Sequence, residues 1–159
     1  GGNGRHSAGE LGPDKVFLLA LNRKDGSVLW QRQIDSGNQL FRKQNSASPS
    51  PITDGQFVWS MTGNGKLACF TMDGKEVWTS DGKASFDLGS FLLADGMFFI
   101  LDGKTGMLRL VEANTAAYQE LASAQVLSGP DVWGPMALSD GKLVLRDLTK
   151  MVCLDVRGK

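Results

Sequence analysis

Cysteine and histidine are the residue types that would supply thiolate or imidazole chemistry, and this sequence has few of them. It contains two cysteines, Cys69 and Cys153, and one histidine, His6. The cysteines are not spaced as Cys-x-x-Cys, and a single histidine cannot build a two-histidine metal site. A hydrolase triad would have to take its imidazole from His6, in a glycine-rich leader, where we expect a solvated loop residue. The sequence therefore predicts no catalytic residues, no metal ligands and no cofactor.

Three aspartates could be imagined as a ring of carboxylates, but their local context predicts turns. Asp54, Asp95 and Asp140 each precede a glycine and lie between two apolar runs. An Asp-Gly pair in that setting is the strongest short-range signal for a β-hairpin, because both central residues of a type I′ turn need positive φ. We therefore expect hairpin turns at these three positions.

Composition narrows the function classes further. The 159-residue chain carries 17 basic and 17 acidic residues, so it has no net charge with which to hold a nucleic-acid backbone. No apolar run approaches the roughly 20 residues that a membrane-spanning helix needs. The 20 glycines are spread along the chain, which favours many tight turns between short strands. We expect an all-β protein with no nucleic-acid partner and no membrane span.

One pattern of segments occurs three times. Each Asp-Gly pair joins two short apolar runs, and the pairs are 41 and 45 residues apart. Every copy continues into a third apolar run, at residues 66–70, 107–111 and 150–154. A second turn and a fourth run follow, ending on an aromatic residue such as Trp78. Four strands in such a period match one four-stranded antiparallel blade of a β-propeller.

The repeat divides the chain into a leader and a set of blades. It assigns residues 1–14 to a glycine-rich loop and residues 15–159 to the propeller. Within the propeller it predicts a half blade at 15–35, blades at 46–81 and 86–127, and a partial blade at 132–159. Three to four blades leave open strand edges. We expect a small four-bladed ring, a homodimer that completes a ring, or part of a longer protein with a ring of about seven or eight blades.

Two stretches, 20–30 and 68–78, share the spacing of an alanine, a turn glycine and a final tryptophan, and residues 153–155 keep the first part of it. This pattern resembles the repeat of pyrroloquinoline-quinone (PQQ) type propellers. Asn22 and Phe70 depart from it, since the family has Asp there. The resemblance implies a fold and not one function, because the repeat builds both quinoprotein dehydrogenases and cofactor-free outer-membrane assembly lipoproteins.

The resemblance also implies roles for the aromatic residues that end each copy. In this family the tryptophan packs between neighbouring blades, which implies that role for Trp30 and Trp78, with Tyr118 in the place of one tryptophan.

Cys69 and Cys153 occupy equivalent third-strand positions two blades apart, beyond the roughly 7 Å Cα separation that a disulfide allows. We expect both to be buried free thiols.

One long polar connection, residues 38–49, joins two of the predicted blades. Loops at the rim of a propeller are where binding usually resides. The connection carries Arg42, Gln44 and Asn45, and Trp133 precedes a Gly-Pro pair at a strand entrance. We expect any ligand or partner to bind at these four residues.

Together these observations favour a non-catalytic propeller module that acts as a binding scaffold for a protein or glycan partner. The alternative is a fragment of a PQQ-dependent quinoprotein dehydrogenase-like enzyme whose cofactor ligands lie outside this chain. The resemblance further implies a periplasmic or extracellular location.

Overall fold

The computed structural model describes residues 15–37, 46–80 and 86–158. All regular secondary structure in this part of the chain is β-strand. The strands are β1 Lys15–Leu21, β2 Val28–Ser36, β3 Ile52–Thr53, β4 Phe57–Met61, β5 Leu67–Thr71, β6 Glu76–Thr79, β7 Phe91–Ala94, β8 Met97–Leu101, β9 Met107–Glu112, β10 Glu120–Gln125, β11 Ala137–Ser139, β12 Lys142–Arg146 and β13 Met151–Asp155. Within the same residues, no helix could cross a bilayer.

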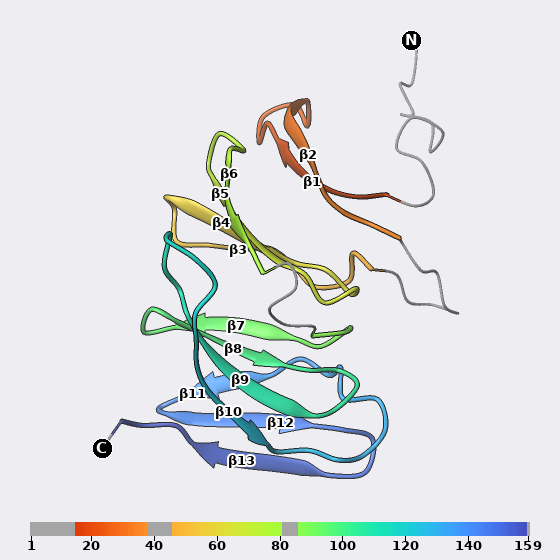
Figure 1. The fold of residues 1–159 in the computed structure, drawn as a ribbon, viewed down its shortest axis with the longest axis vertical. Helices are drawn as coiled ribbons and strands as arrows, with labels where there is room; N and C mark the ends of the chain where they lie inside the picture. Colours follow the sequence, from red (N-terminus) through yellow and green to blue (C-terminus); the bar gives the residue numbers. More distant parts are fainter. Residues whose placement is uncertain (1–14, 38–45, 81–85, 159) are drawn as a thin grey trace.

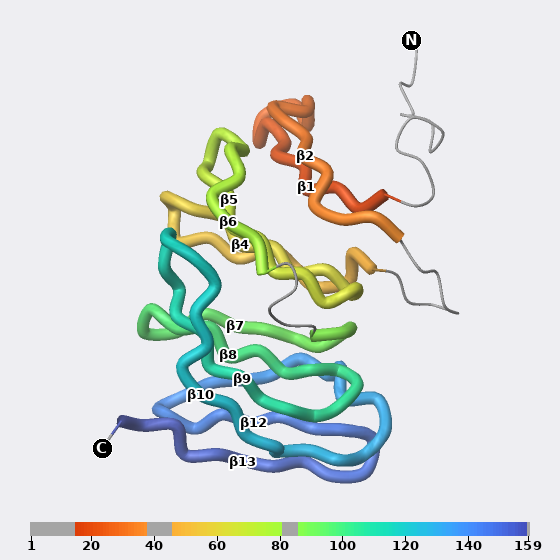
Figure 2. Tube along the Cα trace, in the orientation of Figure 1, coloured from red at the N-terminus to blue at the C-terminus, as the bar shows by residue number. Residues whose placement is uncertain are grey.

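The strands form four antiparallel sheets that follow the order of the chain. The first sheet contains β1 and β2, the second β3 to β6, the third β7 to β10 and the fourth β11 to β13. In every sheet each strand pairs with its neighbour in sequence. The sheets succeed one another along the molecule, and the Cα trace follows the same course (Figures 1 and 2). The chain is therefore all-β, and its sheets are blades of a β-propeller, as predicted.

Apolar side chains fill the spaces between neighbouring sheets. Val16 of β1 packs with Phe70 of β5 between the first and second sheets. Trp59 of β4 and Phe98 of β8 meet edge to face between the second and third sheets, with ring centroids 5.3 Å apart. The cluster between the third and fourth sheets consists mainly of leucine and valine. Burying one such side chain stabilises the fold by about 1.5–3 kcal/mol, so packing between sheets supplies the core.

The hairpin prediction is confirmed at all three Asp-Gly pairs, but the type I′ turn forms at only two of them. Asp95 and Asp140 have φ of 49° and 48°, their glycines are also left-handed, and each pair forms a two-residue loop. Asp54 is different, because it does not have positive φ and its loop spans four residues, with Thr53 paired to Val58. There the Asp54 carboxylate accepts hydrogen bonds from the amides of residues 56 and 57. The longer loop removes the need for a left-handed aspartate, so the type I′ prediction was wrong at this corner.

The strand register corrects the alignment of the two PQQ-like stretches by one residue. Ala20 pairs with Trp30 across β1 and β2, whereas Trp78 pairs with Cys69 and not with Ala68. The cause is the turn between these strands, which closes between residues 22 and 27 in the first sheet but between 71 and 75 in the second. Cys69 therefore takes the alanine position of the repeat.

The two tryptophans donate hydrogen bonds to the sheet that follows. The indole Nε1 of Trp30 lies 2.9 Å from the carbonyl oxygen of Met72, and that of Trp78 lies 2.9 Å from the carbonyl oxygen of Asn114. Both acceptors belong to the turn between the third and fourth strands of the next sheet. Gly74 lies in the first of these turns, and a Cβ on it would come within 2.7 Å of the Trp30 ring.

Tyr118 takes a different position from the tryptophans. It precedes β10, its ring centroid lies 6.1 Å from that of Phe86, and its hydroxyl donates to Glu120. The register instead places Ala122 opposite Leu110, where Trp78 stands opposite Cys69 in the preceding sheet. Tyr118 packs in the cluster between the second and third sheets, so it faces the preceding sheet and not the following one.

The two cysteines occupy the same register position in different surroundings. Cys69 is a buried free thiol, as expected. Cys153 is also free but is exposed, so the prediction that it is buried was wrong. The reason is its place in the fold, because no described sheet covers the face of β13 that carries Cys153.

Candidate functional site

Each connection between two sheets is tied to the sheet that follows it. A backbone amide in the turn between the second and third strands donates to a carbonyl oxygen in the connection. The pairs are Gly63 with Ser46 at 2.7 Å, Gly103 with Phe86 at 3.1 Å and Leu148 with Pro130 at 3.3 Å. Connections and turns therefore lie on one face of the molecule, which we call the connection face.

Buried aspartates shape two of these turns. Asp102 accepts hydrogen bonds from the amides of Lys104 and Thr105, and Asp147 accepts them from the amides of Thr149 and Lys150. The other oxygen of Asp147 accepts from the Gly129 amide at 2.9 Å, which ties the connection to the turn. The Thr149 hydroxyl and these amides lower the pKa of Asp147 to about 2, because they stabilise its charged form.

Two further aspartates have an uncommon backbone conformation. Asp87 and Asp131 have φ of 50° and 54°, and each directly follows the residue whose carbonyl oxygen is bound by the turn. Left-handed residues other than glycine are uncommon, and aspartate is among those that tolerate the conformation best. The two residues therefore mark the same bend in consecutive connections.

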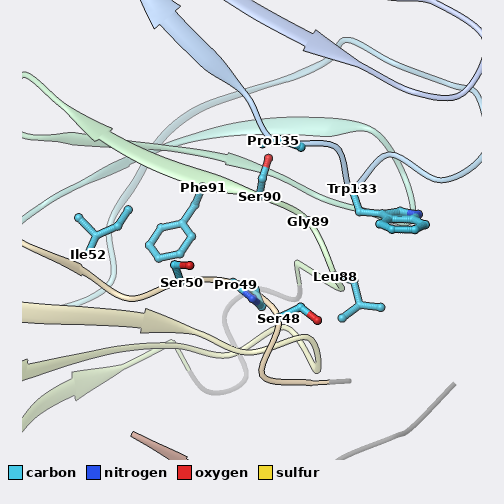
Figure 3. Close-up of a pocket in the computed structure, with 10 residues that line it drawn as sticks. All are labelled: Ser48, Pro49, Ser50, Ile52, Leu88, Gly89, Ser90, Phe91, Trp133 and Pro135. Atoms are coloured by element: carbon cyan, nitrogen blue, oxygen red, sulfur yellow. The ribbon is translucent and has the colours of Figure 1, made fainter. Parts of the chain in front are cut away.

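A pocket of about 460 Å³ opens on the connection face, where the second, third and fourth sheets meet. Its walls come from the connections and from the first strand of the second and third sheets: Ser48, Pro49, Ser50, Ile52, Leu88, Gly89, Ser90, Phe91, Trp133 and Pro135. Figure 3 shows Ile52 and Phe91 at one end and Trp133 at the other. The Trp133 side chain is 44% exposed, which is unusual for an aromatic residue of this size.

A smaller pocket of about 290 Å³ shares Leu88 and Trp133 with the first. Its polar groups are Asp87, Asp131 and Lys104. We call the two pockets together the connection furrow. It thus combines apolar walls and serine hydroxyls with two carboxylates and one ammonium group.

Close backbone contacts fix the shape of the furrow. A Cβ on Gly89 would lie 1.5 Å from the carbonyl oxygen of Leu101, so only glycine fits where the connection crosses the end of β8. Next to it, the Ser90 hydroxyl donates to the carbonyl oxygen of Gly134 at 3.1 Å. This bond joins the third sheet to the segment that carries Trp133.

Of the four residues expected to bind a partner, the structure describes one. Trp133 lines both pockets of the furrow, whereas Arg42, Gln44 and Asn45 lie outside the described residues. Sequence reasoning missed Asp87 and Lys104. A signal was available for Asp87, because an aspartate stands a few residues before the first strand in two consecutive repeats.

The furrow offers groups for binding. Its described lining contains neither cysteine nor histidine, and no three His, Cys, Asp or Glu residues in the described part of the chain are grouped so that they could hold a metal ion. An exposed indole beside hydroxyl and carboxylate groups can pack against an apolar side chain and hydrogen-bond its polar neighbours.

The fold and the repeat define a β-propeller built of PQQ-like blades. The sequence model described as "Outer membrane protein assembly factor BamB" matches residues 14–158, so the chain belongs to this family. No curated protein sequence matches the chain.

Two solved structures are similar to the chain. The first is the computationally designed Ika8 protein, with a TM-score of 0.53 and 13% identity over 76% of this chain and 33% of that one. The second is BamB from Moraxella catarrhalis, with a TM-score of 0.48 and 11% identity over 86% of this chain and 50% of that one. The chain thus spans a third and a half of the lengths of these proteins. At such identity the likeness to Ika8 shows the fold alone.

Proposed function

We propose that the chain is a non-catalytic propeller module that binds a protein partner through the connection furrow. The observation that carries the proposal is Trp133, an indole that is 44% exposed at the junction of the two pockets. Tryptophan is among the residues that most often dominate protein interfaces, because its burial removes a large apolar area from water at little cost in side-chain entropy.

The surroundings of Trp133 support a protein partner. Leu88, Pro49 and Phe91 give the larger pocket apolar walls, and the charged groups lie in the smaller pocket beside it. An apolar centre with a polar rim is the usual arrangement of a protein interface. Membership of a family described as an outer membrane protein assembly factor supports a partner in outer-membrane protein assembly and a periplasmic or outer-membrane-associated location.

Site-specific photo-crosslinking tests the proposal. A benzophenone amino acid placed at position 133 should crosslink to a protein of outer-membrane assembly in cells of the source organism. The matched control is position 121 on β10, because Leu121 is similarly exposed but lies outside the furrow. Equal crosslinking from both positions would contradict a site in the furrow.

The identified partner then allows a quantitative test. Trp133→Ala should weaken its binding by about 30-fold, the effect of a residue worth about 2 kcal/mol at an interface. Leu121→Ala should leave the affinity unchanged, as measured by calorimetry. Unchanged binding by the Trp133 variant would show that the partner sits elsewhere.

Two ligand titrations test the two alternative functions, glycan binding and a quinoprotein dehydrogenase-like role. Saturable quenching of tryptophan fluorescence by a glycan would favour a glycan partner. Saturable binding of PQQ together with calcium, followed by absorbance, would favour the quinoprotein dehydrogenase-like alternative. We expect neither ligand to bind.

A further inference from the structure

A third pocket on the connection face continues the connection furrow into more polar surroundings. It has a volume of about 560 Å³ and shares Asp87 and Lys104 with the smaller pocket of the furrow. Its other polar groups include Asn64, Asp102 and Thr105, which belong to the turns between the second and third strands of the second and third sheets. We call this pocket the polar recess.

Asp102 is the buried acidic group of the polar recess. It is only 7% exposed, and the two amides that it binds, those of Lys104 and Thr105, donate to the same oxygen, Oδ1. Within the described part of the chain, no group donates to Oδ2. The only fully enclosed side-chain nitrogen or oxygen atoms without a partner there are Nε1 of Trp59 and Nε of Arg109. The free oxygen of Asp102 is therefore reached from the recess.

The equivalent aspartate of the fourth sheet has no free oxygen. Asp147 binds the amides of Thr149 and Lys150 through Oδ1, as Asp102 does in its own turn, but its Oδ2 accepts from the Gly129 amide. A buried carboxylate oxygen without a donor is costly, and proteins rarely leave one unpaired. The open oxygen of Asp102 therefore offers a position for a donor that a ligand supplies.

The charges around the recess favour a cationic ligand. The recess and the smaller pocket together present three carboxylates, those of Asp87, Asp102 and Asp131, and one ammonium group, that of Lys104. No three His, Cys, Asp or Glu residues in the described ranges are grouped closely enough to hold a metal ion. An organic cation that donates several hydrogen bonds fits such a site better than an anion or a metal ion does.

We infer that the polar recess binds an arginine side chain of the protein partner proposed above, with the guanidinium paired to the carboxylates of Asp87 and Asp102. A guanidinium has five donors in a planar fork and is more weakly hydrated than an ammonium group, so it enters a partly buried acidic site at lower cost than lysine does. Trp133 lines the pocket that leads into the recess, and an indole face is a favourable contact for a guanidinium. The partner segment therefore carries an arginine next to the apolar side chain that packs on Trp133.

A capped amino acid tests the recess without the partner. In proton–nitrogen NMR spectra of the 159-residue chain, Nα-acetyl-arginine amide should shift the amides of Lys104 and Thr105 saturably. We expect a dissociation constant on the order of 1 mM, the weak affinity of a single side chain. The uncharged isostere, Nα-acetyl-citrulline amide, should produce no saturable shift. Absence of saturable shifts with arginine, or equal binding of citrulline or of the capped lysine or glutamate analogue, would overturn the assignment.

Two variants locate the bound arginine. Asp102→Asn and Asp87→Asn should each weaken its binding by about 10-fold, because each removes one charged acceptor. Asparagine keeps a carbonyl oxygen for the turn amides at position 102 and tolerates the φ of 50° at position 87, so both variants should fold. The control is Asp95→Asn, which removes the same charge at the opposite end of β8 and should leave the affinity unchanged. An equal loss in the control would show that net charge, and not the recess, attracts arginine.

The NMR titration and the crosslinking at position 133 have separate outcomes. Crosslinking without arginine binding would contradict the arginine site but leave the partner site in the furrow intact. Saturable arginine binding without crosslinking would support the arginine site and contradict the proposed partner site at Trp133.

Discussion

At the scale of single residues, the two cysteines show how position in the stack of sheets sets reactivity. Cys69 and Cys153 have the same register position, but only Cys69 is enclosed between two sheets. Burial, with a smaller contribution from the negative charge of Asp54, raises the pKa of the Cys69 thiol to about 11. The thiolate, which is the reactive form, is therefore scarce at Cys69 near neutral pH.

Alkylation should separate the two thiols. Iodoacetamide at pH 8 should label Cys153 in the native protein and leave Cys69 unlabelled, because only Cys153 is accessible. Mass spectrometry of peptides measures the labelling, and unfolding in urea should expose both residues. Equal labelling rates in the native state would mean that the second and third sheets open readily.

Asp147 should contribute an acid-dependent part of the stability. Its pKa is lowered to about 2 from the usual value near 3.8, so its ionised form stabilises the fold above pH 4 and loses that effect as the pH falls towards 2. Asp147→Asn should lower stability at neutral pH and flatten its dependence on pH between 4 and 2. Urea unfolding at several pH values measures the stability of each variant. Asp140→Asn is the control, because it makes the same change in a different turn. An unchanged pH profile would contradict the assigned hydrogen bonds.

At the scale of strands and turns, two matched glycine variants test whether the Trp30 ring packs directly on Gly74. Gly26 and Gly74 have φ of 73° and 80°, so alanine is strained at both, but only at Gly74 would the new Cβ meet the Trp30 ring. Gly26→Ala should cost about 1 kcal/mol and Gly74→Ala about 2–4 kcal/mol. Urea denaturation midpoints give the difference, and equal losses would mean that the indole does not rest on this turn.

The sequence predicted this level of structure well where a signal is local. An Asp-Gly pair between apolar runs was enough to place the turns at Asp95 and Asp140. It could not show that the loop at Asp54 spans four residues, because loop length depends on how the strands pair. The same limit explains the shift between Ala68 and Cys69 and the position of Tyr118, since both follow from strand register and not from spacing along the chain.

At the scale of the whole molecule, a candidate site assembled from several sheets was the hardest feature to predict. Trp133 could be selected because a tryptophan at a strand entrance is conspicuous. Asp87 and Lys104 lie in different segments and approach Trp133 only when the third and fourth sheets pack together. The exposure of Cys153 was equally hard to predict, because equivalence between repeats in the sequence does not reveal whether another described sheet covers that face of the strand.

The position of a sheet in the stack should also set its local stability. The second and third sheets are packed on both faces, whereas the first sheet has two strands and one covered face. Amides of β4, β5, β8 and β9 should exchange with deuterium about 10- to 100-fold more slowly than those of β1 and β2. Peptide mass spectrometry measures the rates, and uniform exchange would contradict opening from the end sheet.

The hydrogen bonds of Trp30 and Trp78 have a consequence for how such chains evolve. Each links one repeat to the turn of its successor, and the acceptor is a backbone carbonyl, which every residue type supplies. Duplication or deletion of a whole repeat therefore preserves a donor on one side of the new junction and an acceptor on the other. Gene rearrangements in multiples of the repeat therefore retain an indole donor and a carbonyl acceptor at every junction between sheets. A break within a repeat leaves an indole without its acceptor.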